Sequence, residues 1–248
     1  MIQIKTPQEI EIMRQAGRIL ANIIKEVKAK AEPGVTTKDL DKLAEELILK
    51  SGSTAAFKGY HGFPAALCVS INEQIVHGAP SKRELKAGDI LSLDLGLVYK
   101  GFCADMAVSL AIGSISPEAG RLIRITKKAL KRGIARVKPG KTIGDIAQAI
   151  QSYVEGQGFQ VVRDLCGHGI GKNIHEDPEV PNFGQRHKGP KLEAGMVLAL
   201  EPMVVMGQPK IKKGPDGFAF QTADNSLSAH FEHTVAVTEK GPKILTEL

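Results

Sequence analysis

Two aspartates eleven residues apart, Asp94 and Asp105, are the first residues in this chain whose type and spacing could support chemistry. Apolar residues alternate with small or polar ones on both sides of Tyr99-Lys100-Gly101, which predicts a β-hairpin. A turn at Tyr99-Lys100 would place the aspartates directly opposite each other, whereas a turn at Lys100-Gly101 would offset them by one diagonal step. Either register leaves two carboxylates within roughly 5–8 Å, where they repel each other. A bound cation or a shared proton would offset that repulsion, unless this face of the hairpin is simply solvated.

A second copy of the pattern favours the cation. The stretch that ends at Asp94 recurs with Glu201 at its end, and the stretch around Asp105 recurs around Glu232. The paired segments are 88–94 with 195–201, 104–110 with 231–237, and 33–40 with 139–146. The chain is therefore predicted to be duplicated, with each half made of a helix followed by a hairpin. Equivalent strands that meet near a pseudo-two-fold axis would bring four carboxylates together, and such a charge density calls for metal ions.

One histidine is the best candidate for a nitrogen ligand beside these carboxylates. His168 lies in a glycine-rich stretch without clear periodicity, and His175 follows seven residues later. A purely structural role is commoner for a single histidine, but the place of His168 in a glycine-rich loop beside the acidic set favours ligation here. Carboxylates with imidazole suit Mn, Fe, Co or Zn. Two such ions about 3.5–4 Å apart would share a water molecule and polarise a carbonyl, which is hydrolytic chemistry.

Composition limits what kind of protein could hold such a site. The chain has 248 residues, 42% of them hydrophobic and 24% charged, and a net charge of +6. This profile is that of an ordinary globular protein, and no linker separates the halves, so we expect one compact domain. The three cysteines, Cys68, Cys103 and Cys166, are odd in number and lack Cys-x-x-Cys spacing, which favours reduced thiols. No signal peptide or membrane-spanning run is apparent, and we expect a cytoplasmic location.

Helix-capping and breaking residues predict the elements that position the site. Helices are expected over about 7–31, 36–51, 116–137 and 142–156, and one buried strand over 64–76. A run of lysines and arginines lies mostly on the third of these helices. A solvated helix face is favoured over a nucleic-acid or ribosome contact, because no aromatic residues interleave the basic ones.

Several motifs taken together resemble the methionine aminopeptidases of the short bacterial type I class, whose pita-bread fold is shared with aminopeptidase P, prolidase and creatinase. The resemblance runs almost from end to end. The motifs are Gly59–Pro64, Ser70–Glu73, His77–Pro80, Asp94, Asp105, Cys166–Gly171, His175-Glu176, Leu200–Pro202 and Glu232–Thr234. It implies an α+β fold with pseudo-two-fold halves, about 1–112 and 113–248, around a central curved sheet. It also implies an enzyme that removes the N-terminal methionine from nascent proteins and peptides, with a preference for a small second residue.

The resemblance further implies roles for individual residues. The dinuclear ligands would be Asp94, Asp105, His168, Glu201 and Glu232, with Asp105 and Glu232 bridging. A metal-bound hydroxide would attack the first peptide carbonyl after Glu201 has accepted a proton from the water, while His77 and His175 would contact the substrate. The methionine pocket matches Tyr60, Phe63, Cys68, Ile174 and Phe218, the last in place of the family's usual tryptophan. A monovalent cation, Na or K, would bind near Asn72 and Ser228.

Spacing identifies the subclass. Glu201 follows His175 by only 26 residues, which leaves no room for the helical insertion of type II enzymes, and no zinc-binding extension precedes the first helix. Two alternatives stay open. One is an exopeptidase of the same fold that acts on Xaa-Pro bonds, like aminopeptidase P or prolidase, and the other is a binding protein of this fold without activity. The partners we expect are a peptide or nascent chain with a free N-terminal methionine and a transient ribosome contact, without membrane or specific DNA binding.

Overall fold

The computed structural model describes all residues from 1 to 248, and its helices begin where the capping residues predict. The side-chain hydroxyls of Thr6, Thr36 and Thr142 each accept a hydrogen bond from the backbone N three residues later, and the acidic side chain of that later residue accepts one from the backbone N of the threonine. These capping boxes satisfy amides that a helix start leaves free. The α-helices are α1 (Pro7–Ala29), α2 (Thr37–Lys50), α3 (Pro117–Ile134) and α4 (Ile143–Glu155).

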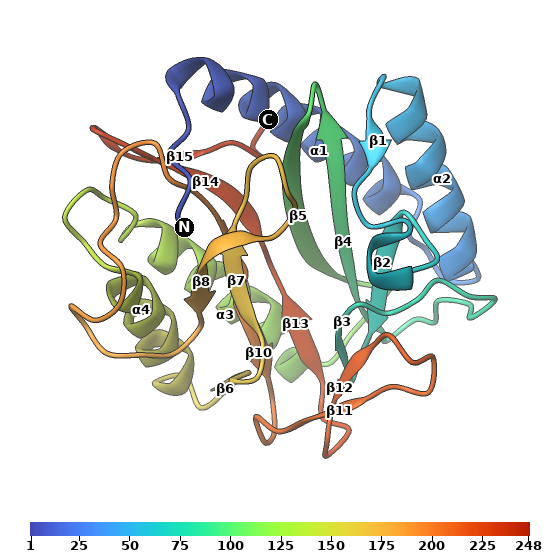
Figure 1. Cartoon of the computed structure of the whole chain (residues 1–248). Coiled ribbons are helices and arrows are strands. Elements are labelled where there is room, and N and C mark those ends of the chain that lie inside the picture. The colour runs from blue at the N-terminus through green and yellow to red at the C-terminus, as the bar shows by residue number, and fades with distance from the viewer.

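Strands make up most of the rest of the chain (Figure 1). Those of the first half are β1 (Thr54–Ala55), β2 (Leu67–Ile71), β3 (Gln74–Val76), β4 (Ile90–Tyr99) and β5 (Phe102–Ala111), with a 3-10 turn at Tyr60–Gly62. Those of the second half are β6 (Gln160–Val161), β7 (Cys166–Gly169), β8 (Glu176–Pro181), β9 (Val197–Leu200), β10 (Met203–Val205), β11 (Ile211–Lys213), β12 (Phe220–Thr222), β13 (Ser228–His230), β14 (His233–Thr238) and β15 (Gly241–Ile244). None of the helices is long and apolar enough to cross a membrane.

The β4–β5 hairpin takes the second of the two registers open to its sequence. Its turn is Lys100-Gly101, with φ of 49° and 78°, and positive φ at both central residues matches the twist of a two-residue hairpin turn. Asp105 therefore pairs with Gly96, and Asp94 with Ala107. The two aspartates lie on one face, offset by a diagonal step.

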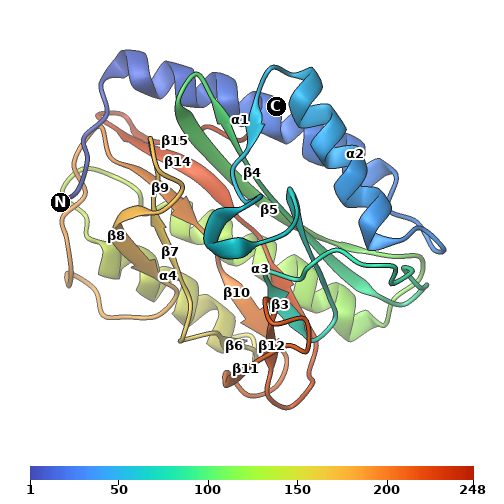
Figure 2. The ribbon, with the colours of Figure 1, turned by 45° about the vertical axis from the view of Figure 1, so that its right-hand side comes forward.

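Each half covers its sheet with two helices. In the first half, α1 and α2 pack on the sheet β1-β4-β2, to which β5 is added beside β4, and share a core with leucines of β4. In the second half, α3 and α4 share a core with β9 and β14, which lie in the sheet β15-β14-β9-β7-β8. Figure 2 shows the two helix pairs on opposite sides of the strands. This is the predicted α+β architecture of duplicated halves.

The duplication extends to backbone detail. The N-cap residue of α2 forms an isolated antiparallel bridge with Glu84, and the N-cap residue of α4 forms the equivalent bridge with Lys191. Strands β9 and β14 pair antiparallel as β4 and β5 do, with His233 opposite Leu200. The longer connection of the second hairpin holds β10 to β13.

Two hydroxyl groups join the halves along a seam between β5 and the β13–β14 segment. The Thr234 Oγ1 accepts a bond from the backbone N of Asp105 (3.0 Å) and donates to its carbonyl oxygen (2.8 Å). The Ser109 Oγ does the same with the backbone N and O of His230, both at 2.8 Å. The Glu232 N donates to the Ala107 O at 2.9 Å. The seam therefore fixes two acidic residues of different halves side by side.

Two sequence predictions of secondary structure were wrong. The single strand expected over 64–76 is two strands, β2 and β3, because the chain turns at Asn72, where φ is 58°, and β3 then pairs with β12. The glycine-rich stretch holds β7 and β8, which pair with each other across an irregular register. A strand that reads Cys-Gly-His-Gly has too few apolar side chains to show the alternation on which such a prediction depends.

Candidate metal centre and active site

The acidic residues singled out in the sequence meet in one cavity of about 310 Å³. They come from separate strands: Asp94 from the middle of β4, Asp105 from β5, Glu201 directly after β9 and Glu232 directly before β14. Continuing the β9–β14 register by one residue places Glu201 opposite Glu232. His168 of β7 joins them, with its Nε2 3.9 Å from the Asp105 Oδ2 and 3.7 Å from the Glu201 Oε1. Ligand atoms of Asp105, His168 and Glu232 all lie within 4.8 Å of one another.

Hydrogen bonding shows that this cluster fits cations. Buried oxygens of Asp94 (Oδ1), Asp105 (Oδ1) and Glu232 (Oε1) have no donor within the protein. Buried carboxylates in that condition are costly unless a cation or proton neutralises them. The His168 Nδ1 lies 2.9 Å from the carbonyl oxygen of Gly169, and an N–H that donates there leaves the lone pair of Nε2 facing the carboxylates. The donor set is therefore the one that divalent metal ions use.

Burial also shifts the protonation of these groups. It raises the pKa of Asp94 to about 7 and that of Glu201 to about 8. The pKa values of Asp105 and Glu232 rise well above their ordinary range, first through burial and then through the neighbouring carboxylates. Burial lowers the pKa of His168 to about 3, so its imidazole is neutral, the form that binds metal. A bound cation would reverse the shifts of the carboxylates.

These shifts predict the pH dependence of metal binding. Because Asp94 and Glu201 hold protons below pH values of about 7 and 8 in the metal-free protein, a divalent ion must displace them. The affinity for Mn²⁺ should therefore rise from pH 6 to pH 8, with protons released on binding. Calorimetric titrations in two buffers of different ionisation enthalpy measure both quantities, and an affinity independent of pH would contradict the prediction.

The same shifts make the stability of the metal-free protein depend on pH. Since the folded pKa of Glu201 is about 8 against an ordinary 4.5, the folded state binds more protons than the unfolded state between these values. The free energy of unfolding of the metal-free protein should fall as pH rises through that window. Bound metal should remove the decrease.

The cavity has an imidazole side and an apolar wall. His77 and His175 both line it, and burial lowers the pKa of His77 to about 4 and also lowers that of His175. The Tyr60 Oη lies 2.8 Å from the His175 Nδ1, which orients that ring. On the apolar wall, the rings of Phe63 and Phe218 meet edge to face with centroids 5.5 Å apart. Neutral imidazoles beside an apolar wall suit an uncharged peptide group and an apolar side chain.

Some residues named from the sequence lie elsewhere. Tyr60, Phe63, Cys68 and Phe218 line the cavity. Ile174 does not, because its side chain points into a separate buried cluster that includes Met13 and Phe102. Asn72 and Ser228 lie outside the cavity at the ends of neighbouring strands. There the Ser228 Oγ is 2.8 Å from the carbonyl oxygen of Asn72 and 2.9 Å from that of Gln74.

Other cavity residues escaped the sequence analysis. Phe57, His61, Lys213 and Gly217 complete the lining. Lys213 is the last residue of β11 and Gly217 lies between β11 and β12, and their approach to the site is a long-range contact without a local pattern. His230 is buried beside the site, its Nε2 3.5 Å from the Glu201 Oε2 and without a hydrogen-bond partner. Period-two alternation places it on the face of Glu232, so the sequence could have identified it.

The thiols lie outside this chemistry. All three cysteines are free. Burial raises the pKa of Cys103 to about 12, that of Cys68 well above its ordinary value, and that of Cys166 to a lesser extent. A protonated thiol is a poor nucleophile. The raised pKa values of the thiols therefore favour a metal site over cysteine catalysis.

Comparison with known proteins agrees with this geometry. The model of metallopeptidase family M24 matches residues 11–239, and the chain belongs to this family. It is 52% identical to a methionine aminopeptidase of Clostridium perfringens, and the alignment covers 99% of each chain. The crystal structure of methionine aminopeptidase from Thermotoga maritima superposes with a TM-score of 0.98 at 44% identity, covering all of both chains. An Xaa-Pro dipeptidase from Bacillus anthracis shares the fold at 25% identity and a TM-score of 0.80, but the chain covers only 62% of it.

Within family M24 the chain thus groups with the methionine aminopeptidases, with which it is similar along its whole length. The fold and the enzyme class expected from the resemblance are confirmed. A member of this metallopeptidase family uses divalent metal ions and acts on a peptide substrate.

Proposed function

We propose that the chain hydrolyses the first peptide bond of peptides and nascent chains that begin with methionine, and that it favours a small second residue. The observation that carries the proposal is the convergence of four carboxylates, three of them buried, and one neutral imidazole on a cavity with an apolar wall. Both halves contribute ligands, so we treat residues 1–248 as one catalytic domain. Its substrates would be met in the cytoplasm.

The metal site we propose holds two divalent ions, of Co, Mn, Fe or Zn. Asp94, Asp105, His168, Glu201 and Glu232 would hold them. Asp105 and Glu232 would bridge, since they lie against each other across the seam of the two halves and each has an unpartnered buried oxygen. Such ions, when bound, polarise a peptide carbonyl and lower the pKa of water.

The chain's own side chains would accept the proton, position the substrate and enclose the methionine side chain. Glu201 would accept a proton at a carboxylate oxygen, since its side chain lines the cavity beside His168. His77 and His175 would hold the scissile peptide group by hydrogen bonds. The wall formed by Tyr60, Phe63 and Phe218, with Cys68, would enclose the methionine side chain and exclude water.

A monovalent cation, Na or K, is proposed beside Asn72. Two carbonyl oxygens, of Asn72 and Gln74, lie within 2.9 Å of the Ser228 Oγ, whose single proton can serve only one of them at a time. This cluster of oxygens is the arrangement that a hard cation uses. It joins β3 to β13, whose last residue, His230, lies beside the metal site.

A ribosome contact through α3 is the weaker part of the proposal. Several basic side chains of α3 lie over aromatic rings of this same chain: Arg132 over Tyr153 (4.4 Å), Lys128 over Tyr153 (5.6 Å) and Arg121 over Phe159 (4.9 Å). These contacts favour a solvated helix face, as the sequence did.

Changing His175 to Ala should separate substrate handling from metal binding. We expect unchanged metal content and a loss of kcat/KM on the order of 100-fold, because the ring touches substrate in our account and a misplaced peptide reacts slowly. The exposed His187, changed to Ala, is the control and should leave both unchanged. Loss of metal from the His175→Ala protein would contradict the assigned role.

Product analysis tests the function itself. Methionine should be released from Met-Ala-Ser, and a peptide with proline second, such as Leu-Pro-Ser, should be cut far more slowly. A chelator should abolish the release. Faster cleavage of the Leu-Pro bond would favour the alternative, an exopeptidase of the same fold that acts on Xaa-Pro bonds.

A further inference from the structure

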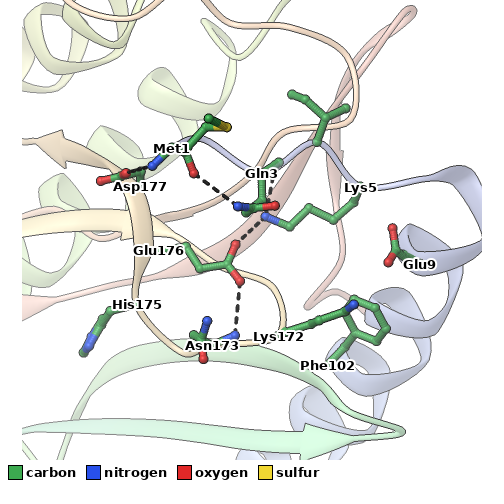
Figure 3. A pocket seen from close by; sticks show the side chains of 11 residues that line it. Met1, Gln3, Lys5, Glu9, Phe102, Lys172, Asn173, His175, Glu176 and Asp177 are labelled. Atoms are coloured by element: carbon green, nitrogen blue, oxygen red, sulfur yellow. Dashed lines mark hydrogen bonds and ion pairs between the residues drawn. The ribbon is translucent and has the colours of Figure 1, made fainter.

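The first residues of the chain lie against the loop that carries His175 (Figure 3). We call residues 1–5, before the cap of α1, the N-terminal strap. The Lys5 Nζ lies 2.7 Å from the Glu176 Oε2, and the two side chains are only 5% and 7% exposed. The Lys5 backbone N donates to the carbonyl oxygen of Gly195 at 2.8 Å, just before β9. The strap is thus tied to the strand that leads to Glu201 and to the residue next to His175.

Glu176 extends this connection to the loop that carries His175. Its Oε1 accepts a hydrogen bond from the backbone N of Asn173 at 3.1 Å, so one carboxylate holds the strap with one oxygen and the loop with the other. Gly171 gives the ion pair its space, since a Cβ there would lie 2.5 Å from the Lys5 Cε and 2.7 Å from the Glu176 Oε1. The carbonyl oxygen of Gly171 accepts from the backbone N of Cys103 on β5 at 2.7 Å.

The loop that presents His175 is therefore fixed at both ends, by β5 at Gly171 and by the strap at Glu176. The other group that orients the imidazole, Tyr60, comes from an exposed 3-10 turn. The strap also makes a second ion pair, between the Met1 amine and the Asp177 Oδ2 (2.6 Å), but its partners are 96% and 61% exposed. Exposed ion pairs contribute little to stability, whereas removing one partner of a buried ion pair is costly because the other charge stays buried without a partner.

We propose that Lys5 and Glu176 are positioning residues that hold His175 in the orientation needed for substrate, an inference that rests on the proposed function. Neither side chain lines the 310 Å³ cavity where the four carboxylates meet, although Glu176 lines a neighbouring cavity that His168 and Glu201 also border. His175 lines both the cavity of the carboxylates and the polar cavity of about 320 Å³ beneath the strap, and so links the two. In this proposal the side chains of Lys5 and Glu176 act on the reaction through His175.

A double-mutant cycle tests this. Lys5→Met should lower kcat/KM for Met-Ala-Ser by about 10- to 100-fold with unchanged metal content, since an error of about 1 Å in placing a reacting group can cost two orders of magnitude. In a His175→Ala background the same change should cost less than about twofold, because the group that it positions is gone. Asp177→Asn removes the exposed ion pair of the same strap and should leave kcat/KM unchanged in both backgrounds.

Glu176→Gln is the second variant, since it keeps an acceptor for Asn173 but removes the charge that pairs with Lys5. It should repeat the pattern of Lys5→Met even if that protein folds poorly. Equal losses in the two backgrounds would overturn the proposal, and so would full activity of both single variants. Wild-type protein assayed in parallel distinguishes failure of the proposed function from failure of this inference. If the wild-type protein releases no methionine, the proposed function is refuted. If wild type and variants release it at the same rate, only the role of the strap is refuted.

Discussion

Asp105→Asn or Glu232→Gln should abolish nearly all activity and remove bound metal. Each change puts a neutral amide in place of a buried carboxylate that is proposed to bridge two ions. The amide offers only one oxygen ligand, and a weaker one. Both positions are 3% exposed or less, so water cannot readily replace the lost oxygen. Metal analysis of purified protein, together with methionine release from Met-Ala-Ser, measures the effect.

The exposed Asp164, changed to Asn, is the matched control and should keep metal and activity. A second readout excludes simple unfolding. In the absence of metal, Asp105→Asn should be at least as stable as wild type above pH 7, since it removes one of several buried carboxylates that repel one another. A variant that keeps two ions per chain and near-normal turnover would remove the bridging assignment.

The second residue of the substrate should change the rate by about two orders of magnitude. The methionine side chain would pack against the wall of Tyr60, Phe63 and Phe218. The next residue would then lie close to His77 and His175 in a cavity of about 310 Å³. A large side chain there must displace the scissile carbonyl, and a displacement of about 1 Å costs on the order of 100-fold. Met-Gly, Met-Ala and Met-Ser peptides should be cleaved well, and Met-Lys, Met-Phe and Met-Leu peptides poorly.

The measurement is kcat/KM over a Met-Xaa-Ser series at constant metal concentration. N-acetylated Met-Ala-Ser serves as the control, because it lacks the charge and the lone pair of the free amine and should be inert. Equal values for Ala and Lys in the second position would show a site more open than the cavity indicates.

The sequence predicted that the carboxylates meet because the chain repeats itself. Asp94 and Asp105 alone were ambiguous, and the recurrence of the pattern at Glu201 and Glu232 resolved the ambiguity. Helix starts were equally accessible, since each capping box is a local device of three or four residues.

The sequence could not decide what depends on distant contacts. The turn at Lys100-Gly101 fixed the register, yet the neighbouring turn fitted the same alternation. The break at Asn72 depends on pairing of β3 with β12, about 150 residues later in the chain. Lys213 and Phe218 reach the cavity from that same region, and Ile174 turns away from it although His175 beside it turns inward.

The most direct test of the account follows methionine release while metal is returned to the protein. Wild-type protein freed of metal by a chelator should release no methionine from Met-Ala-Ser, and activity should return as Mn²⁺ is added, up to two equivalents per chain. Glu232→Gln should stay inactive over the same titration. Methionine release by the metal-free wild-type protein, or full recovery of the Glu232→Gln variant, would contradict the central claim that the buried carboxylates hold the ions that make this chain a peptidase.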